Sequence, residues 1–255
     1  MKLSLPRMLL AALASIAATS PALAQDETAT TTAQGIVENR LRLEFHPVAP
    51  VLAKGQYLFS TLMPMQPAGF RSDQFEHYLS PVYGLGDGWQ VGASLTGAER
   101  IGPGGEALFG GIGLQKQLMQ ERGGRPALAI GAYGMFGPHS HNSQNVYLAA
   151  SKRVWTARSS RPQALFLHAG AKAEFYDGDD YGNSSGIRPF IGANLTLTRR
   201  FFVGAEWAPS QPWETDDQFA VRGTYLFRIK KTLIGVSGGI RNNGYETHPF
   251  IGLVF

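Results

Sequence analysis

The chain has 255 residues, a formal net charge of +4 and no cysteine. So small a net charge argues against a nucleic-acid-binding protein, and without cysteine neither a disulfide framework nor a thiolate metal site can form. Beyond the amino terminus no segment approaches the ~18 continuous apolar residues of a membrane-spanning helix, so this chain could span a membrane only as a closed barrel of strands.

The first 34 residues are expected to lie outside the folded domain. Residues 1–24 combine two basic residues, an apolar stretch and small residues before Ala24. This pattern is typical of a secretory signal peptide, here with cleavage after Ala24, and its removal lowers the net charge to about +2. Residues 25–34 (QDETATTTAQ) are polar and low in complexity, which predicts a disordered leader.

Residues 35–54 form a leading segment with two contrasting parts. In ENRLRLEF, Leu41, Leu43 and Phe45 alternate with polar residues as they would in a strand, whereas HPVAPVLAKG carries two prolines. We expect residues 35–54 to lie at the periplasmic rim of a barrel or inside its lumen. The alternative makes the first part a strand and gives a barrel of fourteen strands.

From residue 55 onward the chain divides into segments with the two-residue alternation of β-strands, separated by turn residues. For example, Ile191 and Leu195 share one face of a segment, while Asn194 and Thr196 share the other. We count twelve segments, at 55–64, 75–83, 88–97, 106–119, 125–136, 144–155, 163–175, 187–198, 201–207, 218–229, 232–241 and 248–255.

The connections between these segments also alternate. Tight basic turns (ERGGR, TARSSRP, TRR and IKK) follow one set of strands, and longer polar or acidic loops (GAERIGPGG, GPHSHNSQ, YDGDDYGNSSG and APSQPWETDD) follow the other. Short turns at one rim and long loops at the other are typical of outer-membrane barrels, whereas a soluble sandwich does not require them. An even strand count also suits a barrel with both termini in the periplasm. We therefore predict an all-β protein of the cell outer membrane, with residues 55–255 forming a transmembrane antiparallel up-and-down β-barrel of about 12 strands.

The last residues, HPFIGLVF, resemble the closing strand of bacterial outer-membrane proteins. Ile251, Leu253 and Phe255 fit the every-second-residue pattern of that strand, whereas Pro249 fits it less well. The resemblance implies that these three side chains form an assembly signal read by the barrel-assembly machinery. It also implies contact with outer-membrane lipids and lipopolysaccharide.

A narrower likeness concerns two hairpins. YGLGDGWQVGASL and GIGLQKQLMQERGGRPALAIG are similar to hairpins of outer-membrane transporters of the phenol-degradation pathway type and of related exopolysaccharide-associated barrels. Because both are generic strand, turn and strand patterns, the resemblance implies a superfamily and no particular solute.

If the apolar faces meet lipid, the opposite faces line a lumen of mixed charge. The ionisable residues predicted to line it are His168, Lys172, Glu174, Glu206, Arg222, Arg228, Arg241 and His248. Oppositely charged residues could pair and fill the lumen, or could set the selectivity of a small-solute channel with a mild ion preference.

A lipid-hydrolysing enzyme is the alternative from another functional class. His141 and Ser143 in HSHNSQN have a His-x-Ser spacing that resembles the active segment of outer-membrane phospholipases and lipid A deacylases. In those families Asn follows the Ser directly, whereas Gln144 does here, and we expect this stretch to be a polar loop tip.

The acidic stretch YDGDDYGN lacks the spacing and terminal Glu of a dedicated calcium loop, which favours a solvated loop. No cofactor or metal site is expected. The sequence thus favours a passive pore or transporter for small solutes over two alternatives, the lipid hydrolase and a closed structural or envelope-assembly barrel plugged by residues 35–45.

Overall fold

The computed structural model describes residues 43, 46–64, 77–98, 107–137, 142–156, 163–177, 184–198, 200–229, 232–244 and 247–254. The chain divides into two units, Met1–Thr31 and Thr32–Phe255, and every described residue belongs to the second. Within the described ranges no helix has the length and hydrophobicity needed to cross a bilayer.

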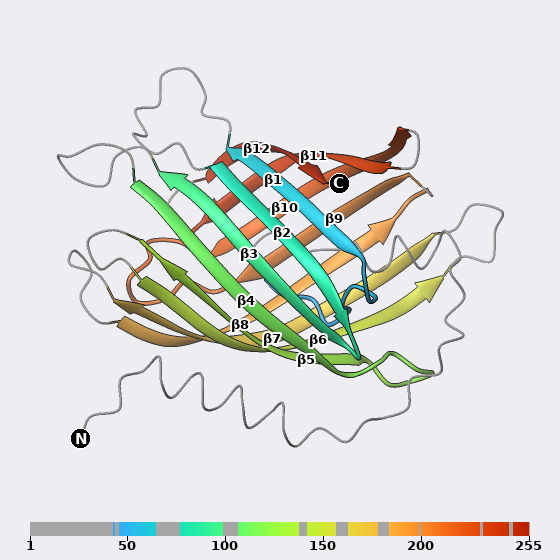
Figure 1. Cartoon of the computed structure of the whole chain (residues 1–255), viewed down its shortest axis with the longest axis horizontal. Helices are drawn as coiled ribbons and strands as arrows, with labels where there is room; N and C mark the ends of the chain where they lie inside the picture. Colours follow the sequence, from blue (N-terminus) through green and yellow to red (C-terminus); the bar gives the residue numbers. More distant parts are fainter. Residues whose placement is uncertain are drawn as a thin grey trace. The chain divides into compact units, whose positions relative to one another are not determined.

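A single antiparallel sheet of twelve strands closes on itself as a barrel (Figure 1). The strands are β1 (Tyr57–Pro64), β2 (His77–Gly86), β3 (Trp89–Ala98), β4 (Ala107–Met119), β5 (Ala127–Phe136), β6 (Asn142–Thr156), β7 (Ala164–Asp177), β8 (Ser184–Thr196), β9 (Phe201–Ala208), β10 (Gln218–Ile229), β11 (Thr232–Asn243) and β12 (Thr247–Val254). Each strand pairs with its sequence neighbours, and β1 pairs with β12 to close the ring. The predicted fold class and the count of twelve are therefore confirmed, and a fourteen-strand ring is wrong.

The alternation of side chains inverts the usual polarity of a soluble protein. In β8, Ile187 is 73% exposed and Ile191 57%, whereas Arg188 and Asn194 are fully buried. Successive side chains of a strand point to opposite faces, and in a closed single sheet the buried face is the interior. The sequence pattern therefore places apolar residues on the outside and ionisable residues inside.

The connections alternate between two rims. Those after β2, β4, β6, β8 and β10 lie at one rim, here called the short-turn rim, and have two, seven, seven, four and two residues. The others lie at the long-loop rim and range from three residues after β11 to twelve after β1. The two-residue turn between β2 and β3 is Asp87–Gly88, where both residues have positive φ, of 51° and 74°. This matches a type I′ hairpin turn, for which an Asp-Gly pair is a preferred sequence.

The strand boundaries differ from the predicted ones by a few residues. β2 continues to Gly86 and β6 begins at Asn142, because ladder pairing extends closer to the turns than the side-chain alternation indicates. Bulges occur between Gly84 and Gly86 in β2, between Gln117 and Met119 in β4, and between Arg153 and Trp155 in β6, all near the short-turn rim. Bulges locally break the period of two and are common at barrel rims.

The seam between the first and last strands is short. It pairs Ser60–Pro64 with Phe250–Val254, whereas β12 pairs with β11 from Thr247 to Val254. Pro249 lies inside β12 opposite Ile240, and the β1 pairing stops one residue before it. Pro249, which fits the closing-strand pattern less well, is thus paired with β11 but not with β1.

Candidate functional site

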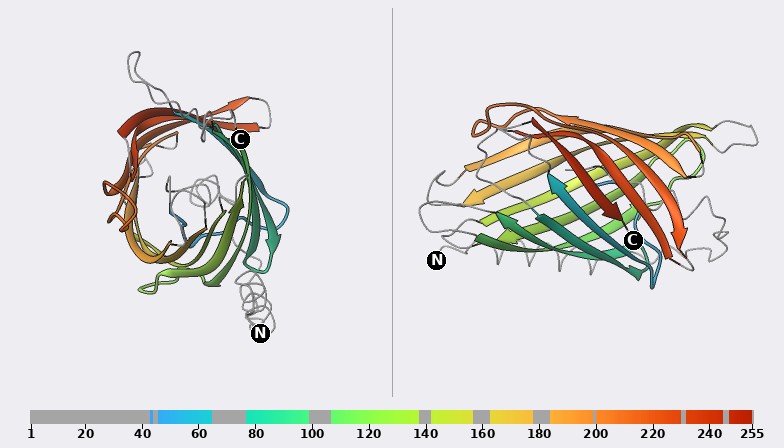
Figure 2. Two further views of the ribbon diagram at one scale, coloured as in Figure 1. Left: turned by 90° about the vertical axis from the view of Figure 1, so that its left-hand side faces the viewer. Right: turned by 90° about the horizontal axis from the view of Figure 1, so that it is seen from above.

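Residues 46–53, here called the lumen segment, cross the inside of the barrel before the chain enters β1 (Figure 2, left). His46, Val48, Ala49, Val51 and Leu52 are all buried. An irregular segment can be buried only if its backbone groups find partners, and the barrel wall supplies them.

Polar side chains from three strands hold the backbone of the lumen segment. The N–H of Ala49 donates to Ser151 Oγ of β6 at 3.0 Å. The N–H of Leu52 donates to Gln90 Oε1 of β3 at 3.1 Å, and Gln115 Nε2 of β4 donates to the carbonyl of Val48 at 2.8 Å. Each bond satisfies a buried backbone group that would otherwise pay the full cost of desolvation.

The beginning of the lumen segment is held by the opposite wall. His46 Nδ1 lies 2.7 Å from Glu206 Oε2 of β9, and its ring stacks on Phe190 of β8 with centroids 4.7 Å apart. When Glu206 is ionised its carboxylate can only accept, and the hydrogen of this bond then belongs to Nδ1. Leu43 packs close to Gly192, where a Cβ would come within 2.7 Å of it. The segment thus bridges β9 to β3 across the lumen.

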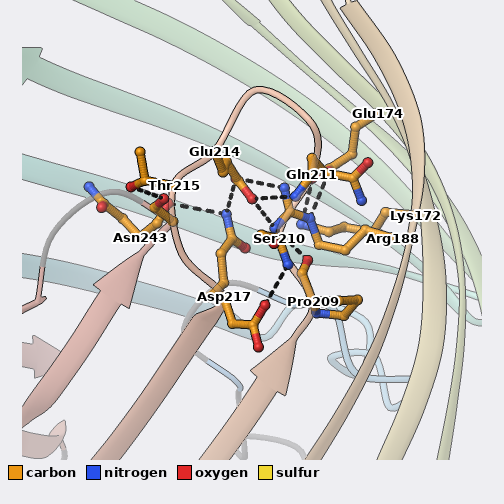
Figure 3. A network of polar contacts seen from close by, with 12 residues as sticks. Lys172, Glu174, Arg188, Pro209, Ser210, Gln211, Glu214, Thr215, Asp217 and Asn243 are labelled. Atoms are coloured by element: carbon orange, nitrogen blue, oxygen red, sulfur yellow. Dashed lines mark hydrogen bonds and ion pairs between the residues drawn. The ribbon is translucent and has the colours of Figure 1, made fainter.

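An acid–base cluster of Lys172, Glu174, Arg188 and Glu214 occupies the wall formed by β7 and β8 (Figure 3). Arg188 donates from Nε to Glu174 Oε2 at 2.7 Å and through both terminal nitrogens to Glu214 at 2.8 and 2.7 Å. Lys172 Nζ lies 2.9 Å from Glu174 Oε1. The forked Arg188–Glu214 pair combines two parallel charge-assisted bonds, which fixes its geometry.

Glu214 belongs to the β9–β10 connection, residues 209–217, which turns inward. Glu214 Oε2 also accepts the N–H of Gln211, and the amide of Gln218 donates to its Oε1. Gln211 is buried against Gly186 of β8, where a Cβ would meet its amide oxygen at 2.1 Å. The absence of a side chain at Gly186 therefore lets this connection lie against the wall.

A second hydrogen-bonded group links β6, β7 and β8 beneath the lumen segment. Ser151 Oγ lies 2.8 Å from His168 Nδ1, and His168 Nε2 lies 3.0 Å from the amide nitrogen of Asn194. Ser151 and His168 have the separation of a nucleophile and its base. Because all three side chains are buried and Ser151 also accepts the N–H of Ala49, this group serves to dock the segment.

A cavity in the lumen lies against β2 to β6. It has a volume of about 250 Å³ and is lined by side chains and backbone of Ser80, Val82, Gln90, Gly92, Ala93, Ser94, Gly113, Leu114, Gln115, Ala132, Tyr133, Met135 and Tyr147. Gln115 Oε1 accepts from Gln90 Nε2 at 3.1 Å and from Tyr147 Oη at 3.0 Å. These three side chains form one end of the cavity, next to the lumen segment.

The predicted lumen residues differ in how deeply they are buried. His168, Lys172, Glu174, Glu206 and Arg241 are buried, Arg222 and His248 are half-buried, and Arg228 is exposed near the end of β10. The structure brings Lys172 to Glu174, and Arg241 Nε to His248 Nε2 at 2.8 Å. Arg228 lies at the short-turn rim and belongs to neither of these two pairs.

Several residues of the site were missed by sequence reasoning. Arg188 has the same inward parity as Asn194, so the alternation in β8 could have revealed it. Glu214 lies in a connection without periodicity, and His46 lies in a proline-containing segment, so no comparable signal marks them. Their roles follow from tertiary contacts.

Only one residue of the alternative catalytic pair, Ser143, lies among the described residues. His141 lies outside the described residues, and Ser143 lies on β6 opposite Met135 and Tyr176, so its predicted loop position is wrong. Among the described residues no group of His, Asp or Glu is arranged to hold a metal ion. Of the residues in the predicted assembly signal, Ile251 and Leu253 face outward, and Phe255 lies outside the described ranges.

Comparisons with known proteins support the fold. No protein-family model and no curated protein matches the chain. The structure resembles that of a KdgM porin in complex with disordered oligogalacturonate (TM-score 0.56, 13% identity) and that of the KdgM porin alone (TM-score 0.53, 12% identity), each match covering 78% of this chain and 98% of the porin. The Acinetobacter baumannii outer-membrane protein Omp33 matches over 79% of this chain and 98% of its own, at 12% identity and a TM-score of 0.42.

At these identities the two KdgM matches establish the fold, a twelve-stranded barrel of the kind found in outer-membrane porins. None of the three proteins is described as a transporter of the phenol-degradation type, so that likeness rests on the two hairpins.

Proposed function

We propose that this protein is an outer-membrane channel for small solutes, with a lumen narrowed by residues 46–53. The observation that carries the proposal is the inverted polarity of a closed barrel. Large apolar side chains such as Ile187 and Ile191 are exposed around the outside, while Lys172, Glu174 and Arg188 are buried within. Only lipid makes such an exterior favourable, because exposed apolar surface of this extent is costly in water.

The exposed aromatic residues support a membrane location. Phe136 and Trp207 lie at strand ends next to the long-loop rim, while Tyr57, Tyr83 and Trp155 lie near the opposite rim. Aromatic side chains gather at both interfaces of a bilayer. In this setting the partners are outer-membrane lipids and lipopolysaccharide, and Ile251, Leu253 and Phe255 act as the signal for the barrel-assembly machinery.

The pairing of lumen charges supports a weak ion preference. Lys172 is paired with Glu174, and Arg188 with both Glu174 and Glu214. Cations neutralised in this way present little net charge to a passing solute, whereas rings of one sign impose strong selectivity. One matched KdgM porin is described with oligogalacturonate, an anionic oligomer, and the paired charges here suit smaller solutes of low net charge.

A closed structural barrel is the second candidate, because the lumen segment and the inward β9–β10 connection both reduce the open cross-section. The hydrolase alternative is weaker, since the buried Ser151–His168 pair, which has the separation of a nucleophile and its base, docks the lumen segment.

Planar-bilayer recording of the purified, folded chain tests the channel directly. We expect discrete conductance steps with a cation-to-anion permeability ratio within about threefold of unity. A folded protein that inserts, as judged by protease protection in vesicles, but gives no steps would refute the channel and favour the closed barrel. Hydrolysis of phospholipid or lipid A that is lost in Ser143→Ala would instead favour the enzyme.

A further inference from the structure

We infer that the lumen cavity is a binding subsite for one neutral, polyhydroxylated solute of monosaccharide size. This inference rests on the proposed channel function and specifies the solute class. It is carried by three features of the cavity: the charge distribution of its wall, the kind of polar groups that line it, and its volume.

Charge is distributed unequally around the lumen. Among the residues of β1 to β5 whose side chains the structure describes, no Asp, Glu, Lys, Arg or His lies on the inward face. The acid–base cluster lies on β7 and β8 and in the β9–β10 connection, and His46 binds Glu206 of β9. A charged solute in the cavity would lose hydration without gaining a counter-ion from this neutral wall, which is unfavourable.

The polar groups of the cavity are hydroxyls and amides. Ser94 Oγ and Tyr133 Oη are hydrogen-bonded to each other. Two hydroxyls together have two hydrogens and four lone pairs, so this pair retains one donor and several acceptors for a solute. Groups that both donate and accept are suited to the hydroxyls of a neutral polyol.

The end of the cavity next to the lumen segment is held rigidly. Gln115 is fixed by its bonds to Gln90, to Tyr147 and to the carbonyl of Val48. Val82 and Met135 add an apolar surface that can meet the C–H groups of a sugar ring. Rigid polar groups beside an apolar patch are typical of small-molecule sites.

The cavity volume bears on the size of the solute. A volume of about 250 Å³ is many times the ~10–15 Å³ that one ordered water needs. It is large enough to hold one sugar ring. Gln90 and Gln115 both line this end of the cavity and bond to the lumen segment, so a solute arriving from the long-loop rim would meet the segment next to the cavity.

Glycines provide a matched pair of test variants. Gly92 lines the cavity, and an added Cβ would meet only ordinary contacts, the nearest being Val82 Cγ2 at 3.6 Å. Gly92→Leu should therefore fill the cavity without disturbing the wall. Gly110 is exposed on the outer face with nothing within 4 Å of an added Cβ, so Gly110→Leu is the control.

The experiment measures binding of D-glucose, D-glucuronate and D-glucosamine to the full chain refolded in detergent micelles, by ligand-observed NMR titration. These sugars share a ring and differ in charge. We expect D-glucose to bind at least tenfold more tightly than either charged sugar. Gly92→Leu should weaken D-glucose binding at least tenfold, while Gly110→Leu leaves it unchanged.

Tyr133→Phe gives a second reading that does not depend on filling the cavity. It retains the ring that covers Gly113 and removes only the hydroxyl, so we expect weaker D-glucose binding with unchanged unfolding in urea. Equal affinities for the three sugars, or equal effects of the two leucine variants, would overturn the inference.

The channel and the subsite can fail separately. A protein that conducts but does not bind D-glucose would refute the subsite and leave the channel standing. A protein that binds D-glucose with these variant effects but gives no conductance would refute the channel alone.

Discussion

Loosening the lumen segment should increase the conductance of the barrel. Val48 is only 2% exposed and packs with Ala149 and Phe190. Val48→Ala removes two methyl groups, each worth about 0.8 kcal/mol of burial, and leaves a small void. We call the lumen segment docked when it is bound to the barrel wall and undocked when it is released. Val48→Ala should lower the free energy of docking by about 2 kcal/mol. Since 1.4 kcal/mol corresponds to a factor of ten, the undocked-to-docked ratio should rise about 30-fold.

Single-channel recording in planar bilayers measures this ratio as the fraction of time spent in a larger conductance state. The matched control is Val221→Ala on the outer face, where the side chain is 51% exposed and does not touch the lumen segment. We expect Val221→Ala to behave as the unaltered chain does. Indistinguishable traces for the two variants would refute the reasoning.

A covalent lock provides the opposite perturbation. Because the chain has no cysteine, Ala49→Cys combined with Ser151→Cys introduces the only possible disulfide. The Ala49 N–H donates to Ser151 Oγ, so these positions are adjacent. Oxidation should abolish the larger conductance state and reduction should restore it. Persistence of that state in fully oxidised protein would show that the segment does not control it.

Three further predictions concern the stability of the β9–β10 connection, the pH dependence of that stability, and the lipid-facing side of the barrel. Glu214→Gln should leave part of the charge of buried Arg188 uncompensated, destabilising the β9–β10 connection by about 3 kcal/mol and speeding its proteolysis, whereas Asp216→Asn should not. Hydrogen bonds from the Ser210 N–H and the Trp207 indole hold the pKa of Asp217 below its usual range. The contribution of ionised Asp217 to the stability of the connection is therefore fully present above the pKa of the unfolded state, and it is lost as the pH falls through the lower pKa of the folded state. Trp207 fluorescence should accordingly change at a pH below the ordinary pKa of aspartate, and a transition at that ordinary pKa would contradict this assignment. Ile191→Arg should lower the free energy of unfolding in lipid vesicles by about 2 to 4 kcal/mol, and an unchanged urea midpoint would argue against lipid contact.

The fold could be predicted from the sequence because each strand carries its own signal. Alternation in β8 distinguishes Ile191 from Asn194, and the same rule holds in β10, where Val221 and Tyr225 are exposed while Thr224 is buried. Connection lengths then give the topology, since adjacent antiparallel strands need only short turns. Local alternation left the count open between twelve and fourteen, because ENRLRLEF alternates as a strand does, and the pairing of β1 with β12 decides for twelve.

The contents of the lumen could be predicted only in part. Strand parity placed His168, Lys172 and Glu174 on one face, but it gives no indication of which side chain bonds to which. Glu214 reaches Arg188 from a connection, and His46 reaches Glu206 from a segment 160 residues away. These contacts depend on three-dimensional closure of the ring, which local periodicity does not encode.

The short β1–β12 seam has a consequence for where the strand pairing of the barrel opens locally. Its pairing covers Ser60–Pro64 and Phe250–Val254, and Pro64 has no N–H to donate at the point where the pairing stops. Long ladders such as β6–β7, which runs from Asn142 to Thr156, open only with the whole sheet. The amide hydrogens of the seam should therefore exchange with deuterium first, which makes β1 and β12 the place where lateral opening of the wall would begin.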